Sequence, residues 1–451
     1  MTNAKTFFRA FLGTAALAAL IVLPASAQAQ ATSAENPGRA VDAGTRAAVI
    51  EKVVQQLNAF YIDLDLAGQM EKSLREKLRQ GAYDALTEQA AFLSQVTRDL
   101  RAVSHDLHLG VWPIERALDA GENSSEEEKQ RLKAVARYNN NGFMQVARLH
   151  GNVGYLELSY FEDVGPGGET AVAAMNWLAD SDALIIDVRR NGGGSDVVRL
   201  VESYLFPGPV HVMDSYSRVS KTTTQQWTMD YVPGRRLADI PVYILQSRRT
   251  ASAAERLAYS LKNLRRATLV GEVSRGAANP VEEFSFPELK ICMAVSAYKV
   301  QSPVTGTSWE GVGVVPDIDV PAEKALDAAC VEAMKTLLKE KAGEDITQWR
   351  TWALEMYQAL FEPVTLGKEM LAGYLGSYGP VYSVTAADGH LNLKNNYAMP
   401  MTLIPLGEDR FAFKEEEGVG RFTRDQKGVV IGLEIRLADG YQTSLNKGFK
   451  S

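Results

Sequence analysis

One serine stands where this chain could perform nucleophilic catalysis. Ser252 opens the stretch "SAAERLAYSLKNL", shortly after the apolar run "PVYILQ". The four residues "SAAE" also fit a capping box, in which Ser252 and Glu255 satisfy the first amides of a helix, and a cap alone would explain the serine. A nucleophile needs two further groups: a base that removes the hydroxyl proton, and donors that stabilise the developing oxyanion.

A run of three glycines could supply such donors. Gly192, Gly193 and Gly194 follow the apolar run "ALIIDV", and glycine lets the backbone approach a ligand and point its amides at it. The run lacks the lysine of a phosphate-binding P-loop and the spacing of a dinucleotide-binding fingerprint. Two interpretations remain open, a tight turn without function and an oxyanion hole beside Ser252.

The candidates for the base are few, because the chain has five histidines. His105 and His108 lie together in "SHDLHLGV", whereas His150, His211 and His390 have no comparable setting. The pair lacks a credible third ligand nearby, so we predict no metal site. A histidine with a purely structural role is the ordinary alternative.

The elements that position these residues follow from the apolar pattern. Short apolar runs at 153–158, 183–188, 241–246 and 267–272 alternate with helical patterns. Such runs predict an α/β layer whose strands are buried on both faces. Ser252 and the glycine run then follow the carboxyl ends of strands, where open α/β sheets collect ligands.

Other patterns flank this core. Three helical periodicities before residue 116 predict a small bundle, and the polar stretch 119–130 predicts a solvated linker. Helical patterns recur at about 322–340 and 347–361. Beyond Gly367 the apolar residues alternate, which predicts an antiparallel β-domain. In "IGLEIRL" the alternation places four residues on one face, namely Ile431, Leu433, Ile435 and Leu437.

The first residues have the composition of an export signal. Lys5 and Arg9 precede the apolar run "FLGTAALAALIVL", and "ASA" at 25–27 supplies small residues for cleavage. The run is shorter than the roughly 20 residues that a membrane anchor needs. We therefore predict that residues 1–27 are a signal peptide, and that the mature protein is periplasmic or secreted without a membrane span.

Charge and cysteine content restrict the partners. The formal net charge is -7, and loss of two basic residues with the signal peptide makes it more negative, so no nucleic-acid partner is expected. Cys292 and Cys330 are compatible with one disulfide or with two unpaired structural cysteines. The oligomeric state is not predicted.

Three stretches, in order along the chain, resemble a known family. "ALIIDVRRNGGG", "SRRTASAAERLAYSLKNLRRATLVGE" and "TGTSWEGVGVVPDIDV" are similar to successive signatures of the tail-specific, or C-terminal-processing, serine peptidases. The branch that they resemble most contains the tricorn protease core and the interphotoreceptor retinoid-binding protein modules. The resemblance spans about residues 100–322.

This resemblance implies a crotonase-like ββα core that carries a Ser-His-Glu site and needs no cofactor. Ser252 would be the nucleophile and His108 the base, while Glu310, in "WEGVGV", would orient or support the site. The substrate would be a peptide or a protein.

The oxyanion hole implied by the resemblance consists of backbone amides. The amide of Ala253 would provide one donor, and the region of Gly193 or Gly194 would provide the other. Both segments would then act on the same carbonyl oxygen.

The family has a second catalytic arrangement, in which a lysine replaces the histidine as the base. In this chain the corresponding position is Ala277, and no lysine occurs between Lys262 and Lys290. The histidine branch is therefore predicted. An auxiliary serine that some members place beside the histidine is Leu107 here, so Ser274 or Ser104 would have to replace it.

These observations predict an α/β protein with added helical and β parts. The expected division is a signal peptide at 1–27, a helical bundle at 41–116, a serine peptidase core at 140–322, a helical connection at 323–362 and a C-terminal β-domain at 367–451.

The predicted function is that of a secreted serine endopeptidase which forms an acyl-enzyme. Two alternatives use the same core. One is a non-catalytic module that binds a hydrophobic ligand or a protein. The other is crotonase-type chemistry on an acyl thioester, for which Ser252 would not be needed.

Overall fold

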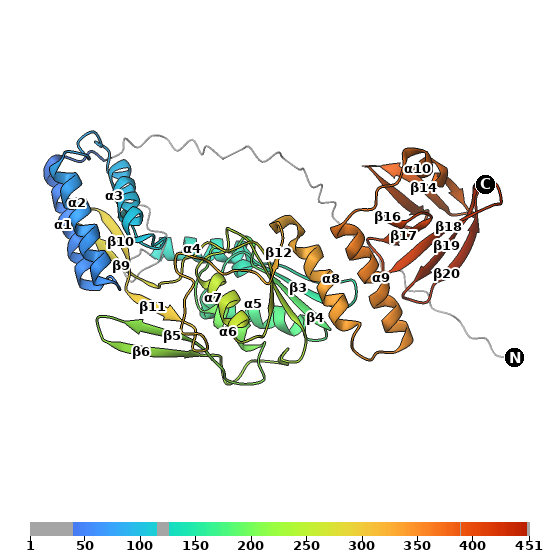
Figure 1. The fold of residues 1–451 in the computed structure, drawn as a ribbon, viewed down its shortest axis with the longest axis horizontal. Helices are drawn as coiled ribbons and strands as arrows, with labels where there is room; N and C mark the ends of the chain where they lie inside the picture. The colour runs from blue at the N-terminus through green and yellow to red at the C-terminus, as the bar shows by residue number, and fades with distance from the viewer. Residues whose placement is uncertain (1–38, 115–125, 388, 449–451) are drawn as a thin grey trace.

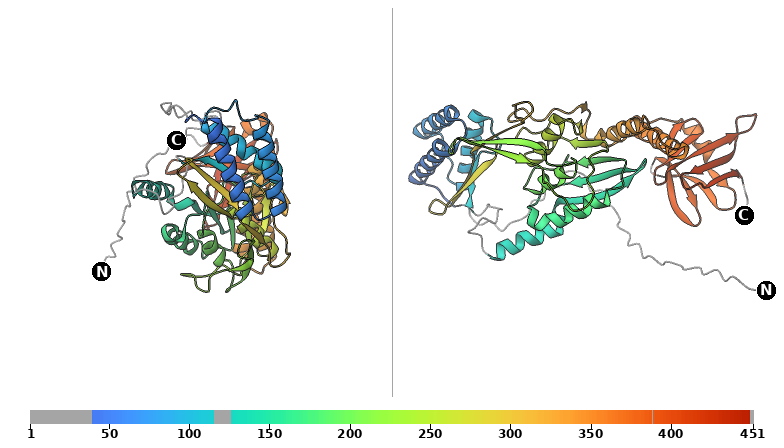
Figure 2. Two further views of the ribbon diagram at one scale, coloured as in Figure 1. Left: turned by 90° about the vertical axis from the view of Figure 1, so that its left-hand side faces the viewer. Right: turned by 90° about the horizontal axis from the view of Figure 1, so that it is seen from below.

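The computed structural model describes residues 39–114, 126–387 and 389–448 (Figure 1). The predicted signal peptide and residues 119–125 of the predicted linker lie outside them. Along the longest axis of the molecule, the N-terminal helices, a central α/β core and a C-terminal β-structure follow one another (Figures 1 and 2). The predicted fold class is confirmed.

The central sheet has the strand order β12-β8-β7-β4-β3-β2. The four predicted apolar runs form β3, β4, β7 and β8, which are parallel to one another, whereas β2 is antiparallel to β3. The strands are β2 (Phe143–Leu149), β3 (Val153–Leu158), β4 (Ala183–Asp187), β7 (Val242–Gln246), β8 (Thr268–Gly271) and β12 (Ile318–Asp319).

Helices cover both faces of this sheet. Alternate residues of one strand enter different cores, so that Ile186 of β4 packs on one side and Ile185 on the other. Burial on both faces explains why the strands read as continuous apolar runs. The first face carries α5 (Val164–Trp177), α6 (Val197–Ser203) and α7 (Ala253–Asn263), and the second carries α8 (Ala325–Leu337) and α9 (Glu344–Phe361).

The predicted N-terminal bundle contains three helices and a sheet. The helices are α1 (Ala43–Phe60), α2 (Leu64–Arg79) and α3 (Gln89–Ser104), and the sheet has the order β1-β10-β9. Strand β1 (Gly110–Pro113) follows the helices directly, but β9 (Val281–Phe286) and β10 (Ile291–Ser296) lie far from them in the sequence. This hairpin places Ile291, Met293 and Val295 in the interior of the bundle. The helices therefore depend on a distant segment for their core.

A second small sheet lies beside the central core. Its order is β11-β5-β6, and β6 is an edge strand. The strands are β5 (His211–Ser217), β6 (Thr222–Trp227) and β11 (Tyr298–Gln301). The turn between β5 and β6 is tied to the end of α1, because Arg218 Nε donates to the carbonyl of Tyr61 at 2.8 Å.

The linker prediction is wrong for residues 126–130, which belong to helix α4 (Glu126–Tyr138). Most of its described side chains are exposed, so burial does not stabilise it. The helix begins with glutamates and has Arg137 in its last turn, charges that favour the helix dipole at each end. A low apolar content had indicated a linker, yet these residue types form exposed helices well.

The C-terminal part consists of α10 (Lys368–Tyr374) and eight antiparallel strands in chain order. A bridge between Tyr378 and Lys447 joins the first strand to the residue after the last, so the edges of the sheet meet. The strands are β13 (Gly376–Tyr378), β14 (Tyr382–Ala387), β15 (His390–Asn395), β16 (Ala398–Gly407), β17 (Arg410–Phe413), β18 (Gly418–Arg424), β19 (Val430–Leu437) and β20 (Gln442–Asn446).

One residue of the predicted alternation in β19 lies on the opposite face. Leu433 and Ile435 are buried, but Ile431 is 47% exposed. The register between β18 and β19 shifts near Thr423, and such a bulge inserts an extra residue into one strand. Val430 takes the buried position instead.

The two cysteines are unpaired. Cys292 and Cys330 are both buried and free, and they lie on β10 and α8. Of the two interpretations left open by the sequence, the structure supports unpaired structural residues. Within the described residues, no helix has the length and apolar character needed to cross a membrane.

Candidate active site

Ser252 lies in a strained backbone conformation between β7 and α7. Its φ is 54° and its ψ is -120°, a region that side-chain-bearing residues rarely adopt and that is often found at functional sites. The preceding loop holds it there. Thr250 Oγ1 donates to the carbonyl of Val188 at 2.8 Å, and the Ala251 amide donates to the carbonyl of Asn191 at 3.1 Å.

The predicted capping box is present, and its glutamate does more than cap the helix. The Ser252 amide donates to Glu255 Oε2 at 2.9 Å. The Ser252 hydroxyl faces the third amide of the helix without a hydrogen bond of normal geometry. Fully buried, Glu255 also accepts from the Ala277 amide at 2.9 Å, and from the Gly276 amide and Ser274 Oγ at 2.5 Å each. Sequence reasoning had missed this linking role.

The glycine run packs directly against the serine. A Cβ atom on Gly193 would lie 2.6 Å from Cβ of Ser252, and one on Gly194 would lie 2.0 Å from the carbonyl oxygen of Phe161. Their φ angles are +116° and +129°. Close approach and backbone conformation therefore both require glycine at these positions.

The two glycines differ in the use of their amides. The Gly193 amide donates to Asn191 Oδ1 at 2.8 Å. The amides of Gly194 and Ala253, by contrast, have no acceptor among the described residues. Of the predicted oxyanion donors, the amides of Gly194 and Ala253 are thus free to donate. The amide of Gly193 already donates to Asn191.

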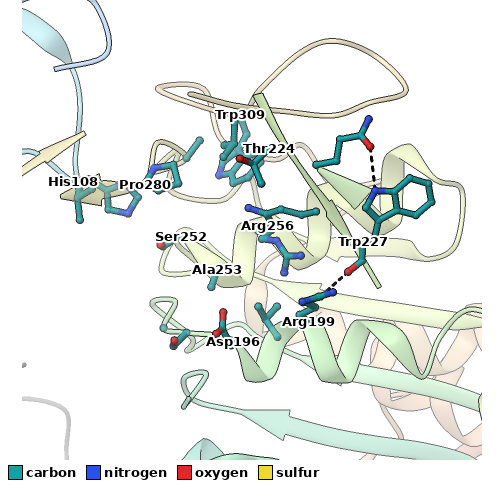
Figure 3. A pocket seen from close by; sticks show the side chains of 18 of the residues that line it. His108, Asp196, Arg199, Thr224, Trp227, Ser252, Ala253, Arg256, Pro280 and Trp309 are labelled. Carbon is teal, nitrogen blue, oxygen red and sulfur yellow. Dashed lines mark hydrogen bonds between the residues drawn. The ribbon is translucent and has the colours of Figure 1, made fainter. Parts of the chain in front are cut away.

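His108 reaches the same cavity from the other side. It follows α3, whose C-cap is His105 in a left-handed conformation. His108 and Ser252 both line one cavity of about 840 Å³ (Figure 3). Burial lowers the pKa of His108, while the charges of Asp106 and Glu255 oppose that shift. Nδ1 of the ring is buried without a hydrogen-bond partner of normal geometry, although the backbone of Asn279 is near enough to raise the pKa of His108. No hydrogen bond joins the ring to Ser252 among the described residues.

Glu310 supports the cavity from a neighbouring loop. Its Oε2 accepts the amides of Ala278 and Asn279 at 2.7 Å each, and its Oε1 is buried without a partner. Burial, followed by the charge of Asp106, raises the pKa of Glu310 to about 7. Its hydrogen bonds within the described chain therefore go to a loop and not to the imidazole.

The residues proposed to replace the auxiliary serine are already engaged. Ser274 Oγ donates to Glu255 and accepts the Val314 amide at 2.7 Å. Ser104 Oγ donates to the carbonyl of Leu100 at 3.0 Å and accepts the Asp106 amide at 3.2 Å. Among the described residues, neither hydroxyl has a hydrogen bond to the His108 ring.

The described lysines lie away from this cavity. Lys262 forms an ion pair with Asp317 at 2.9 Å and donates to the carbonyl of Val315. No described lysine lines the cavity.

The cavity extends away from Ser252 along α7 and β6. Figure 3 shows Ser252, Ala253 and His108 at one end, with Arg256, Arg199 and Trp227 further along. Arg256 is paired with buried Glu202 at 3.1 Å, and Arg199 donates to the carbonyl of Trp227 at 2.6 Å.

Sequence comparison decides the family. The sequence model of peptidase family S41 matches residues 152–320, and that of its N-terminal domain in eukaryotic IRBP matches residues 44–145. The chain belongs to peptidase family S41. The predicted family is confirmed.

Curated relatives in this family match over part of their length. A carboxyl-terminal-processing protease of Picosynechococcus sp. is 29% identical over 182 residues, which cover 38% of this chain and 40% of the relative. A tail-specific protease of Haemophilus influenzae is 29% identical over 150 residues, or 31% of this chain and 21% of the relative. The chain thus spans well under half of these relatives.

Solved structures are similar at low sequence identity. A photosystem II D1 C-terminal processing protease shares 14% identity with a TM-score of 0.44, covering 62% of this S41 chain and 94% of that one. The tricorn protease shares 12% identity with a TM-score of 0.41, covering 63% of this chain and 35% of that one.

Proposed function

We propose that this S41 chain is a serine endopeptidase which hydrolyses peptide or protein substrates through an acyl-enzyme on Ser252. One observation carries the proposal. Ser252, held at φ 54° at the start of α7, shares a cavity with His108 and with the free amide of Gly194. Nucleophile, base and oxyanion donor are the three groups that acyl transfer requires.

In the proposed reaction, His108 removes the hydroxyl proton of Ser252 while Oγ attacks the substrate carbonyl. The amides of Ala253 and Gly194 hold the resulting oxyanion. His108 then gives its proton to the leaving amine, and water releases the acyl group by the same steps in reverse order. Because no hydrogen bond joins the His108 ring to Ser252 among the described residues, the ring has to turn or approach Oγ during this cycle.

Hydrolysis of an unfolded protein substrate tests this function. The wild-type protein is expected to release fragments, and Ser252→Ala is expected to release none. The binding-module alternative predicts no turnover by either protein. Thioester chemistry on the same fold predicts that Ser252→Ala still hydrolyses an acyl-thioester substrate.

We further propose that residues 1–27 are removed on export and that the mature protein acts in the periplasm or outside the cell. The support is the charged start, the short apolar run and the small residues at 25–27. N-terminal sequencing of exported protein should give a start near Gln28. A protein that begins at Met1 in a membrane fraction would contradict this proposal.

A further inference from the structure

The proposed base and the proposed nucleophile belong to different parts of the fold. His108 lies between α3 and β1, within the N-terminal bundle, whereas Ser252 stands at the start of α7 in the core. The bundle consists of residues 39–114 and the β9–β10 hairpin, which share one apolar interior. The separation between the imidazole and Oγ therefore depends on how the bundle is seated on the core.

The junction between the bundle and the core has few hydrogen bonds. The β9–β10 hairpin leaves the core after Pro280 and returns at Ala297, whose amide donates to the carbonyl of Pro280 at 3.1 Å. The backbone of Asn279 lies near the His108 ring. Within the described residues, every hydrogen bond of normal geometry between residues 39–114 and the core outside this hairpin comes from one side chain, Arg218.

Arg218 binds the C-terminal end of α1. It lies in the turn between β5 and β6, which extend from the core toward the N-terminal helices (Figure 1). Its Nε donates to the carbonyl of Tyr61 at 2.8 Å, and one terminal nitrogen donates to the carbonyls of Asn58 at 3.0 Å and Ala59 at 2.8 Å. Carbonyls at the end of a helix lack partners within it and carry the negative end of its dipole. A planar guanidinium can therefore satisfy several of them at once.

Tyr61, whose carbonyl Arg218 binds, also packs against the turn that carries His108. The Tyr61 side chain is buried, and burial followed by the charge of Asp106 raises its pKa. Asp106 Oδ1 in turn accepts the His108 amide at 2.9 Å and the Leu109 amide at 3.3 Å. Because packed interiors transmit displacements, a shift of the end of α1 would move the backbone of His108.

The strand that follows Arg218 forms one wall of the cavity. Residues 224–227 of β6 line the cavity together with His108 and Ser252. The cavity wall formed by β6 and the bundle that carries the proposed base thus meet at Arg218.

Resting on the proposed function, we propose that Arg218 is a positioning residue of this site. By binding the end of α1, it holds the bundle in the orientation that keeps the His108 ring in the cavity with Ser252. Arg218 does not itself line the cavity, so it acts through α1 and the turn of His108.

Hydrogen exchange tests this role without any need for activity. Arg218→Gln removes the charge and most of the donors, whereas the control Lys221→Gln removes a charge from an exposed position of the same turn. In Arg218→Gln the exchange of the His108 and Leu109 amides should rise by about tenfold, because charge-assisted hydrogen bonds that seat their turn are lost. The interior of α1, at residues 49–57, should keep its protection. Lys221→Gln should match the wild type throughout.

Turnover gives the second readout. We expect Arg218→Gln to lower kcat by about tenfold, since the base would be in place in a smaller fraction of molecules. KM should change little, because the cavity walls formed by α7 and β6 remain. Arg218→Lys keeps the charge without the planar fork, and its kcat should lie between those of Arg218→Gln and the wild type. Lys221→Gln should keep the wild-type kcat.

The outcomes separate the two proposals. The positioning role of Arg218 is overturned if Arg218→Gln exchanges like the wild type at His108 and Leu109. Equal loss of protection in α1 and β4 would also overturn it, since that pattern indicates general destabilisation, and so would an unchanged kcat in an active protein. If exchange rises at the His108 turn alone but the wild type hydrolyses no protein substrate, the seating of the bundle by Arg218 stands and the proposed peptidase function fails.

Discussion

The amide of Ser252 donates a 2.9 Å hydrogen bond to the buried carboxylate of Glu255, which also binds the loop at residues 274–277. A residue expected only to cap a helix thus connects the candidate nucleophile with the segment where other family members are expected to carry a lysine. The strained conformation of Ser252 depends on such surrounding contacts.

Replacement of Glu255 should therefore destabilise the fold as well as the site. In Glu255→Gln the side-chain NH₂ group faces amide donors that need an acceptor, and each unsatisfied buried group costs about 1–3 kcal/mol. Urea unfolding should show a loss of that order, together with reduced turnover. The exposed Glu323 provides a matched control, and Glu323→Gln should change neither quantity. Equal stability of the two variants would disprove the linking role.

Ser252→Ala should abolish turnover and leave the stability nearly unchanged. The hydroxyl makes no cap hydrogen bond of normal geometry, so its removal should cost less than the usual cap loss of about 0.5–2 kcal/mol. Thermal midpoint and peptide turnover are measured on the same preparation. A clear drop in the midpoint with turnover retained would identify Ser252 as a cap.

His108→Ala should lower kcat by on the order of a thousandfold or more, as loss of a triad member does elsewhere. His105 is exposed and ends α3, so His105→Ala serves as the control and should have little effect. Retained turnover in His108→Ala, with loss in a variant of Lys262, Lys290 or Lys299, would place the chain in the lysine branch.

The acid limb of kcat/KM should lie below the ordinary histidine value of 6.5, because burial lowers the pKa of His108. The base must be neutral to accept a proton, and a lower pKa keeps it neutral to lower pH. A pH profile from 4 to 9 on a peptide substrate measures this limb. An acid limb well above neutrality would show that another group is the base.

Glu310 should make the stability depend on pH. Its pKa is raised from 4.5 to about 7, so the folded state favours the protonated form. The contribution of protonated Glu310 to the free energy of unfolding is fully present below pH 4.5, and it is lost as the pH rises through 7. Glu310→Gln cannot ionise, and its thermal midpoint relative to the wild type should therefore increase between pH 5 and pH 8. A constant difference would show that the Glu310 pKa is not raised.

The sequence was sufficient to predict the parts of the site that depend on local patterns. The strands around Ile185 and Ile244 read as continuous apolar runs because both of their faces are buried. Ser252 and Gly194 each follow one of these strands, so their approach could be expected. The family motifs indicated His108 and Glu310, and their roles remain proposals.

Features that depend on distant partners could not be predicted. Residues 281–296 complete the N-terminal bundle although they lie far from it in the sequence. The occupied amide of Gly193 depends on where the Asn191 side chain points, and the exposure of Ile431 depends on a register shift with another strand. Apolar periodicity carries none of this information.

The central claim is that Ser252 is the nucleophile of a serine peptidase. Treatment of the mature protein with a fluorophosphonate, followed by peptide mapping, tests it most directly. The account predicts one adduct per chain, located on Ser252, with labelling strongly reduced in His108→Ala and absent in Ser252→Ala. An unlabelled wild-type protein, or an adduct on another residue that persists in Ser252→Ala, would contradict it.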